Sequence, residues 1–150
     1  MEVQPDFKEL LALFNAHRVK HIIVGAYAVG HHGSPRYTGD MDVYVRPDTE
    51  NACGVLAALT EFGFGSVGLA IEDFCVPDRV VQLGYPPVRI DIITSISGVS
   101  WDEAYAGRVA GVFGDVPVFY LGLKELITNK RATGRLKDLA DVEALGELPR

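Results

Sequence analysis

Two aspartates separated by one residue, Asp40 and Asp42, begin the strand-like segment DMDVYV at residues 40–45. Alternate side chains of a β-strand point to the same face, so these two carboxylates are predicted to lie together. Neighbouring carboxylates repel each other unless a cation lies between them. Two oxygen ligands on one rigid strand suit Mg²⁺, which takes its remaining ligands from water and phosphate. The alternative is a surface strand that carries two solvated acids.

A third aspartate occupies a similar position in the segment VRIDIIT at residues 88–94. The alternation of this segment predicts that Asp91 projects from the interior of a strand, where it is a natural third ligand for the same cation. An ion pair with a neighbour such as Arg89, or a buried hydrogen bond, explains a single aspartate equally well. The combination of Asp91 with Asp40 and Asp42 favours the metal site.

The dipeptide Gly25-Ala26 follows the β-branched run HIIV and precedes a short helical segment. A helix N-terminus offers unpaired N–H groups and a positive dipole to phosphate, and glycine permits close approach of the backbone. The sequence contains neither a P-loop nor a complete G-x-G-x-x-G motif at this point. A plain turn between strand and helix is the alternative.

Charge is unevenly distributed along the chain. The net charge of −6 argues against a broad surface for nucleic acid, and bulk binding of duplex DNA is not expected. The segment 124–137 is nevertheless basic, with a local charge of +4 from Lys124, Lys130, Arg131, Arg135 and Lys137 against Glu125. Such a segment can face a phosphate ligand, or it can be a solvated face of a helix.

The elements that must position these residues follow from periodicity and turn signals. We predict a helix at 5–18, a strand at 21–25, a short helix after it, and a strand at 41–45. A helix capped by Asp48 should end near Gly63, and a capping box at Ser100–Glu103 should start another helix. Two strands within 79–94, a strand at 116–121 and two C-terminal helices separated at Gly134 complete one domain over 1–150, with those helices at about 122–147.

Several remaining residues are expected to be structural. Cys53 and Cys75 lie in apolar contexts without metal-ligand spacing, which predicts reduced thiols in the core. His31 and His32 are expected to be packed or hydrogen-bonded, and Trp101 to contact the core together with Tyr105. The acidic N-terminus does not fit a signal peptide, and no apolar run approaches the ~20 residues that span a bilayer. These features favour a cytoplasmic protein without a membrane partner.

The stretch VGAYAVGHHGSPRYTGDMDVYV, together with Asp91, resembles the minimal nucleotidyltransferases of the DNA polymerase β-like superfamily. Their pattern is Gly-Gly or Gly-Ser, a spacer, an Asp-x-Asp pair and a third acid on a later strand. Gly25-Ala26, the spacer 27–39, Asp40, Asp42 and Asp91 occupy those places. Ala26 departs from the pattern, because it keeps the backbone donor but lacks the hydroxyl of serine.

The C-terminal segment KRATGRLKDLADVEAL resembles the motifs of single-chain bacterial nucleotidyltransferases, including those of the abortive-infection toxin type. The resemblance implies that Lys130 faces the triphosphate of a nucleotide and that Asp138 completes the site near Asp141. Arg135, Lys137 and Arg36 would neutralise the rest of the triphosphate charge. Thr38 is expected to orient the loop before Asp40 within the nucleotide-binding region.

The fold implied by the resemblance is α+β, with a small mixed sheet and helices packed mainly on one side. The implied reaction transfers an NMP from an NTP, such as ATP, to an acceptor hydroxyl and releases pyrophosphate. Two Mg²⁺ ions, or Mn²⁺ in their place, would be held by Asp40, Asp42 and Asp91, and Asp91 would orient or deprotonate the acceptor.

The acceptor is left open between a protein, an RNA end and a small molecule. The alternatives to an active enzyme are a non-catalytic nucleotide-binding module that acts with a partner protein and an antitoxin-like or scaffold protein with a vestigial site. The substitution of Ala26 in the glycine motif motivates the first of these alternatives. A neighbouring gene that encodes a toxin would favour a protein acceptor.

Overall fold

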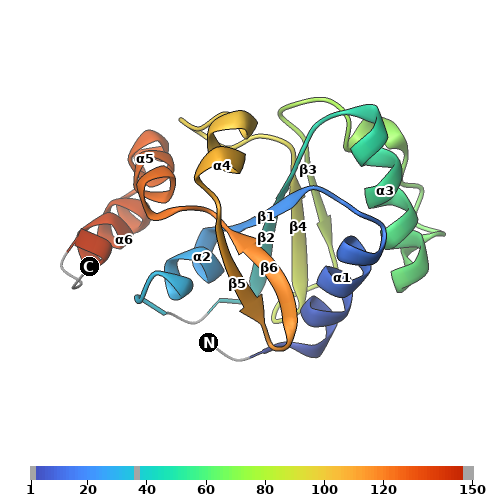
Figure 1. Cartoon of the computed structure of the whole chain (residues 1–150), viewed down its shortest axis with the longest axis horizontal. Helices are drawn as coiled ribbons and strands as arrows, with labels where there is room; N and C mark the ends of the chain where they lie inside the picture. The colour runs from blue at the N-terminus through green and yellow to red at the C-terminus, as the bar shows by residue number, and fades with distance from the viewer. Residues whose placement is uncertain (1–2, 36–37, 147–150) are drawn as a thin grey trace.

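The computed structural model describes residues 3–35 and 38–146 (Figure 1). Within these ranges a six-stranded sheet has the order β3-β4-β2-β1-β6-β5. The strands are β1 His21–Val24, β2 Asp40–Val45, β3 Val80–Leu83, β4 Arg89–Ile93, β5 Val109–Phe113 and β6 Val116–Tyr120. The α-helices are α1 Pro5–Ala16, α2 Gly25–His31, α3 Thr49–Leu59, α4 Trp101–Gly107, α5 Leu123–Thr133 and α6 Leu136–Gly146. A π-helical turn, Thr60–Phe64, and a 3₁₀ turn, Ile71–Asp73, follow α3.

The sheet is mixed, as the sequence predicted. Strand β2 is antiparallel to β1 and parallel to β4, and β1 is parallel to β6. The outer strands β3 and β5 pair antiparallel with β4 and β6. The central strands β1, β2 and β4 are therefore the ones whose ends position the polar residues discussed below.

The main apolar core lies between the sheet and the helices α1 and α3, which lie together on one side of it in Figure 1. Helix α1 buries Phe7, Leu10, Leu11 and Phe14, a spacing of three and four residues that forms one apolar stripe. Met41, Val43 and Val45 alternate along β2 and are also fully buried. On the other face of β2, the ring of Tyr44 packs edge-on against Trp101 of α4.

Most of the predicted elements are present. The side chain of Asp48 caps α3, the capping box of Ser100 and Glu103 begins α4, and Gly134 separates the two C-terminal helices with a φ of 69°. Helix α1 ends at Ala16, two residues before the predicted end. Strand β5 was not predicted, because Ala110 and Gly111 weaken its strand signal. The Gly114-Asp115 pair between two apolar runs was the sequence signal for this hairpin.

The prediction that both cysteines lie in the core was wrong. Cys53 is exposed and Cys75 is only half-buried, although both thiols are free. Helix α3 turns Ala52, Val55 and Leu59 toward the sheet, so the 3.6-residue repeat places Cys53 on the outer side.

The histidines and Trp101 have the structural roles that were expected. His31 stacks on Tyr120 with ring centroids 4.1 Å apart, and the Nε2 of His32 lies 2.8 Å from the carbonyl oxygen of Leu121. Trp101 is buried in the core, and Tyr105 is partly buried beside it. Each of the four rings therefore has a contact within the protein.

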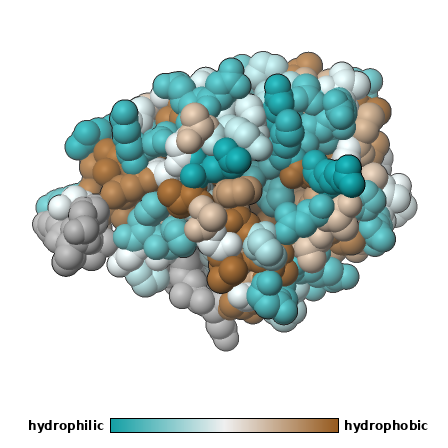
Figure 2. Space-filling model, viewed as in Figure 1, coloured by the Kyte–Doolittle hydropathy of each residue, from teal (hydrophilic) through white to brown (hydrophobic). Residues whose placement is uncertain are grey.

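The surface mixes hydrophilic and hydrophobic side chains. Figure 2 shows hydrophobic residues gathered over the β5–β6 hairpin, where Val112 and Phe119 are exposed. None of the helices in the described ranges combines the length and the apolar character needed to cross a membrane.

Candidate active site

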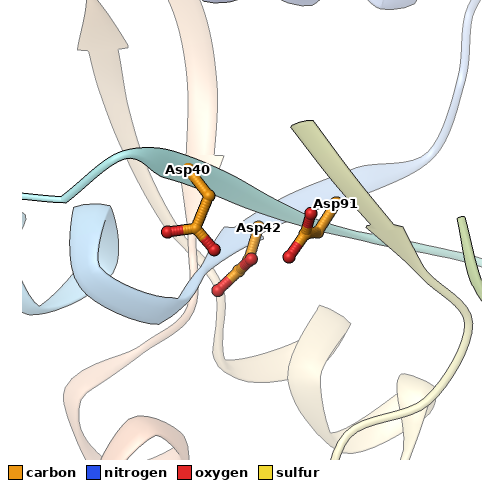
Figure 3. Close-up of side chains that lie close together, drawn as sticks. All are labelled: Asp40, Asp42 and Asp91. Atoms are coloured by element: carbon orange, nitrogen blue, oxygen red, sulfur yellow. The ribbon is translucent and has the colours of Figure 1, made fainter. Parts of the chain in front are cut away.

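The pairing of β2 with β4 brings three carboxylates to one place. Asp42 and Asp91 are direct partners in the parallel register, and Asp40 lies two residues earlier on the same face of β2. One carboxylate oxygen from each of the three aspartates lies within 4.8 Å of the other two. Figure 3 shows the side chains pointing into a common space from the two strands. The alternation read from the sequence therefore holds, and we call these residues the aspartate cluster.

Gly25 lies against the aspartate cluster because Val24, the last residue of β1, is paired with Asp42. A Cβ atom built on Gly25 would be 2.2 Å from Oδ2 of Asp42, which is far too close for any side chain. Gly25 also has a φ of 66°, a conformation that favours glycine. The absence of a side chain at position 25 thus makes room for the Asp42 carboxylate. Ala26, the next residue, is buried at the start of α2.

Arg89 bridges two members of the aspartate cluster. Its Nε and Nη2 donate to Oδ1 and Oδ2 of Asp91 at 2.9 and 3.0 Å, and Nη2 also donates to Oδ2 of Asp40 at 3.0 Å. Thr38 donates to the other oxygen of Asp40 at 2.7 Å. The ion pair with Asp91 was anticipated as an alternative, but the bridge to Asp40 was not. That contact depends on the register of two strands distant in sequence, for which the sequence gives no signal.

The surroundings of Asp40 and Asp42 shift their pKa values in opposite directions. Burial, followed by the negative charges of Asp40 and Asp91, raises the pKa of Asp42 to about 7. Burial acts against ionisation of Asp40 as well, but hydrogen bonds from Thr38 and the charge of Arg89 leave its pKa below the usual value. Without a further cation, the ionised form of Asp42 is therefore less stabilised by its surroundings than that of Asp40.

The donor set of the aspartate cluster fits a hard divalent cation. Carboxylate oxygens are the ligands that Mg²⁺ and Mn²⁺ prefer, whereas Zn²⁺ favours histidine and cysteine. In the part of the chain that the structure describes, this cluster is the group of acidic, histidine or cysteine side chains with ligand atoms close enough for one ion. Three carboxylates this close together repel one another, and a divalent ion bound between them would relieve that repulsion.

The C-terminal residues form a separate polar cluster between α5 and α6. Nζ of Lys130 lies 2.9 Å from Oδ1 of Asp138 and 3.3 Å from Oδ2 of Asp141. Oδ2 of Asp138 also accepts from Thr133 and from Nε of Arg135, each at 2.7 Å. The side chain of Lys130 is only 6% exposed and that of Asp138 is fully buried, so this cluster joins the two helices across Gly134.

The remaining nucleotide-binding candidates lie in different settings. Arg135 contacts Asp138 but is 62% exposed, and Lys137 is exposed on α6. Arg36 lies outside the described residues. Lys130 was expected to face the triphosphate and Asp138 to complete the site, but in this structure they are paired with each other.

No family model matches this chain, and comparison with curated proteins finds no match. Solved structures do match. One is a crystal structure of a candidate nucleotidyltransferase from Thermotoga maritima, with a TM-score of 0.61 and 13% identity over 97% of this chain and 94% of that one. Another is the solution structure of the antibiotic-resistance factor ANT(2'')-Ia, with a TM-score of 0.58 and 16% identity over 94% of this chain and 80% of that one. This chain has the nucleotidyltransferase fold.

The two matches extend over 97% and 94% of this chain. At these low identities the likeness concerns the fold, and function is carried by the site. What this chain can do chemically therefore depends on the aspartates, Gly25 and the cations near them.

Proposed function

We propose that this protein is a metal-dependent nucleotidyltransferase that moves an NMP from an NTP to an acceptor hydroxyl. The observation that carries the proposal is the aspartate cluster, three carboxylates from two paired strands whose oxygens lie within 4.8 Å. Gly25 supports it, because the glycine leaves the Asp42 carboxylate accessible beside the start of α2. The fold shared with a structure described as a candidate nucleotidyltransferase is consistent with this chemistry.

The proposed reaction is a displacement at the α-phosphorus. The acceptor oxygen forms a bond to that phosphorus, the bond from the phosphorus to the oxygen bridging to the β-phosphate breaks, and pyrophosphate leaves. The hydroxyl proton passes to a base, for which Asp91 is our candidate. Asp40, Asp42 and Asp91 would hold two Mg²⁺ ions, with Mn²⁺ as the alternative. When bound, such ions stabilise negative charge on the attacking and leaving oxygens.

The triphosphate needs cations beyond the metal site. Arg135 and Lys137 are the exposed C-terminal candidates, and Arg36 is the candidate that precedes Asp40 in the sequence. Lys130 is committed to Asp138 and Asp141, so contact with phosphate would require it to exchange partners. Gly25 and Ala26 would contribute backbone to the nucleotide site, and Thr38 would orient Asp40 through its hydrogen bond.

The finer features of the proposal follow from the sequence. ATP is the first NTP to test, and a protein, an RNA end and a small molecule are the acceptor classes. The C-terminal motif suggests the abortive-infection type, within a toxin–antitoxin pair and with a partner protein. We place the protein in the cytoplasm, where nucleoside triphosphates are made.

Thermal stabilisation by nucleotide tests the proposal. A ligand that binds only the folded state must raise the melting temperature, so each NTP is added with Mg²⁺ or with EDTA. We expect a Mg²⁺-dependent rise for the wild type and none for Asp42→Asn. Asp115→Asn, a change in the exposed turn between β5 and β6, is the matched control and should keep the rise.

The outcomes separate the candidate functions. A rise followed by transfer of label from α-labelled NTP supports an enzyme. A rise without turnover in the presence of protein, RNA and small-molecule acceptors favours the non-catalytic module, for which the substitution at Ala26 is the specific reason. If no NTP changes the melting temperature, the nucleotide site itself is refuted.

A further inference from the structure

Arg89 donates hydrogen bonds to the aspartate cluster. Within the described residues, all hydrogen bonds from its Nε and Nη2 go to Asp40 and Asp91. It takes both oxygens of Asp91, whose side chain is 9% exposed, and one oxygen of Asp40. Arginine and carboxylate in this paired geometry form strong, charge-assisted hydrogen bonds. The guanidinium is thus held between Asp40 and Asp91, where one positive charge faces three carboxyl groups.

Arg89 hydrogen-bonds to two of the three carboxylates that a divalent ion would use as ligands. Both oxygens of Asp91 accept from Arg89, and the two oxygens of Asp40 accept from Arg89 and Thr38. A dication beside the guanidinium would also be repelled by it, because like charges a few ångströms apart interact strongly in a partly buried site. Full coordination and the present Arg89 contacts therefore compete.

The Arg89 side chain has room to leave. It is 30% exposed, and it belongs to the first residue of β4, at the end of the strand rather than in its middle. At this position the arginine side chain can change rotamer and become solvated without leaving a cavity in the core. The carboxylate of Asp91 stays on β4 when the arginine moves, so the aspartate cluster keeps its backbone frame.

We propose that Arg89 is the resident counter-cation of the aspartate cluster, which a divalent ion displaces from Asp40 and Asp91 when it binds. The inference rests on the proposed function and adds a feature to it. Arg89 keeps the metal-free cluster folded by balancing part of its charge, and it lowers the affinity for any cation that cannot replace it. Arg89 is in this role a positioning residue, because it acts through the carboxylates.

A side-chain NMR titration with Mg²⁺ alone tests this proposal without nucleotide or turnover. The signal of the Arg89 Nε–H group, assigned through its own backbone in the wild type, should shift or broaden as Mg²⁺ binds. Nε of Arg135 is a matched internal reference, since it also donates to a carboxylate, Asp138, but outside the aspartate cluster. Its signal should stay in place.

Calorimetry with Mg²⁺ provides the second arm. Arg89→Met removes the competing charge, and we expect it to bind Mg²⁺ on the order of tenfold more tightly than the wild type. Arg79→Met is the control, because Arg79 precedes β3 and pairs with Thr94 beyond the far end of β4 from Arg89. This change should leave the affinity unchanged. Should Arg89→Met fail to fold, the wild-type titration still decides the question.

Two results would overturn the inference in distinguishable ways. If Mg²⁺ saturates the wild type while the Arg89 signal does not move, Arg89 orients the carboxylates instead, and the proposed function stands. If calorimetry detects Mg²⁺ binding to neither the wild type nor Arg89→Met, the metal site of the proposed function fails together with the inference.

Discussion

Asp42 lies between Asp40 and Asp91 in Figure 3, and its environment shifts its pKa into the neutral range. Its pKa is raised to about 7 by burial and by the two neighbouring charges. An acid with a raised folded pKa binds more protons in the folded state than in the unfolded one between about pH 4 and pH 7. In EDTA, the free energy of unfolding should therefore decrease as the pH rises through this window.

Removal of the Asp42 charge should abolish this loss of stability. We expect Asp42→Asn to be more stable than the wild type at pH 8 in EDTA, by roughly 2–4 kcal/mol, and nearly equal to it at pH 4. Urea unfolding at both pH values measures the difference. Glu9→Gln, on the exposed side of α1, is the control for loss of a negative charge. Equal stability of wild type and Asp42→Asn at pH 8 would contradict the proposed environment of Asp42.

Gly25 permits a second test at the level of single residues. In Gly25→Ala the new methyl group would meet Oδ2 of Asp42, so the carboxylate must move out of the cluster. We expect at least a tenfold loss of Mg²⁺ affinity, of order 1.4 kcal/mol or more. Gly134→Ala is the matched control, because Gly134 has nearly the same φ, 69°, but no atom within 4 Å of the added carbon.

Both glycine variants pay for a left-handed backbone, which costs roughly 1–2 kcal/mol for a residue with a side chain. Their stabilities should therefore fall by similar amounts from this cause. Only Gly25→Ala should lose Mg²⁺. If Gly134→Ala loses Mg²⁺ to the same extent, the effect comes from strain and not from the contact with Asp42.

At the scale of elements, one buried lysine of α5 forms ion pairs with two aspartates of α6. Lys130→Met would leave Asp138 and Asp141 buried without their shared cation, a change that typically costs about 3–5 kcal/mol. Lys137→Met, on the exposed side of α6, should change the stability by less than about 0.5 kcal/mol. Urea unfolding at pH 7 measures both, and similar values for the two variants would show that the buried pair is not needed.

The sequence predicted elements better than it predicted their contacts. Asp48, the Ser100 capping box and Gly134 mark helix ends through local hydrogen bonds and backbone conformation, and such signals lie within a few residues. The partners of Lys130 could not be read in this way. Asp138 and Asp141 lie beyond the break at Gly134, and only the turn between the helices decides which charges meet.

On the scale of the whole molecule, the proximity of the three aspartates could be predicted and their hydrogen bonds to other residues could not. The alternation of Asp40 and Asp42 is a property of one strand, and it placed both carboxylates correctly on one face. The neighbours of these carboxylates depend on which strands pair and in which register. Arg89 contacts Asp40 only because the parallel pairing sets these two residues side by side.

The parallel pairing of β2 with β4 also has a kinetic consequence. Residues 46–88 separate the two strands and include α3 and β3, so the aspartates meet only after a long loop has closed. Pairings between segments so far apart in sequence form slowly and carry a large entropic cost. An unfolded chain thus offers a divalent ion no assembled set of ligands. Such an ion would bind after folding and slow the unfolding of the chain. It would not speed up folding.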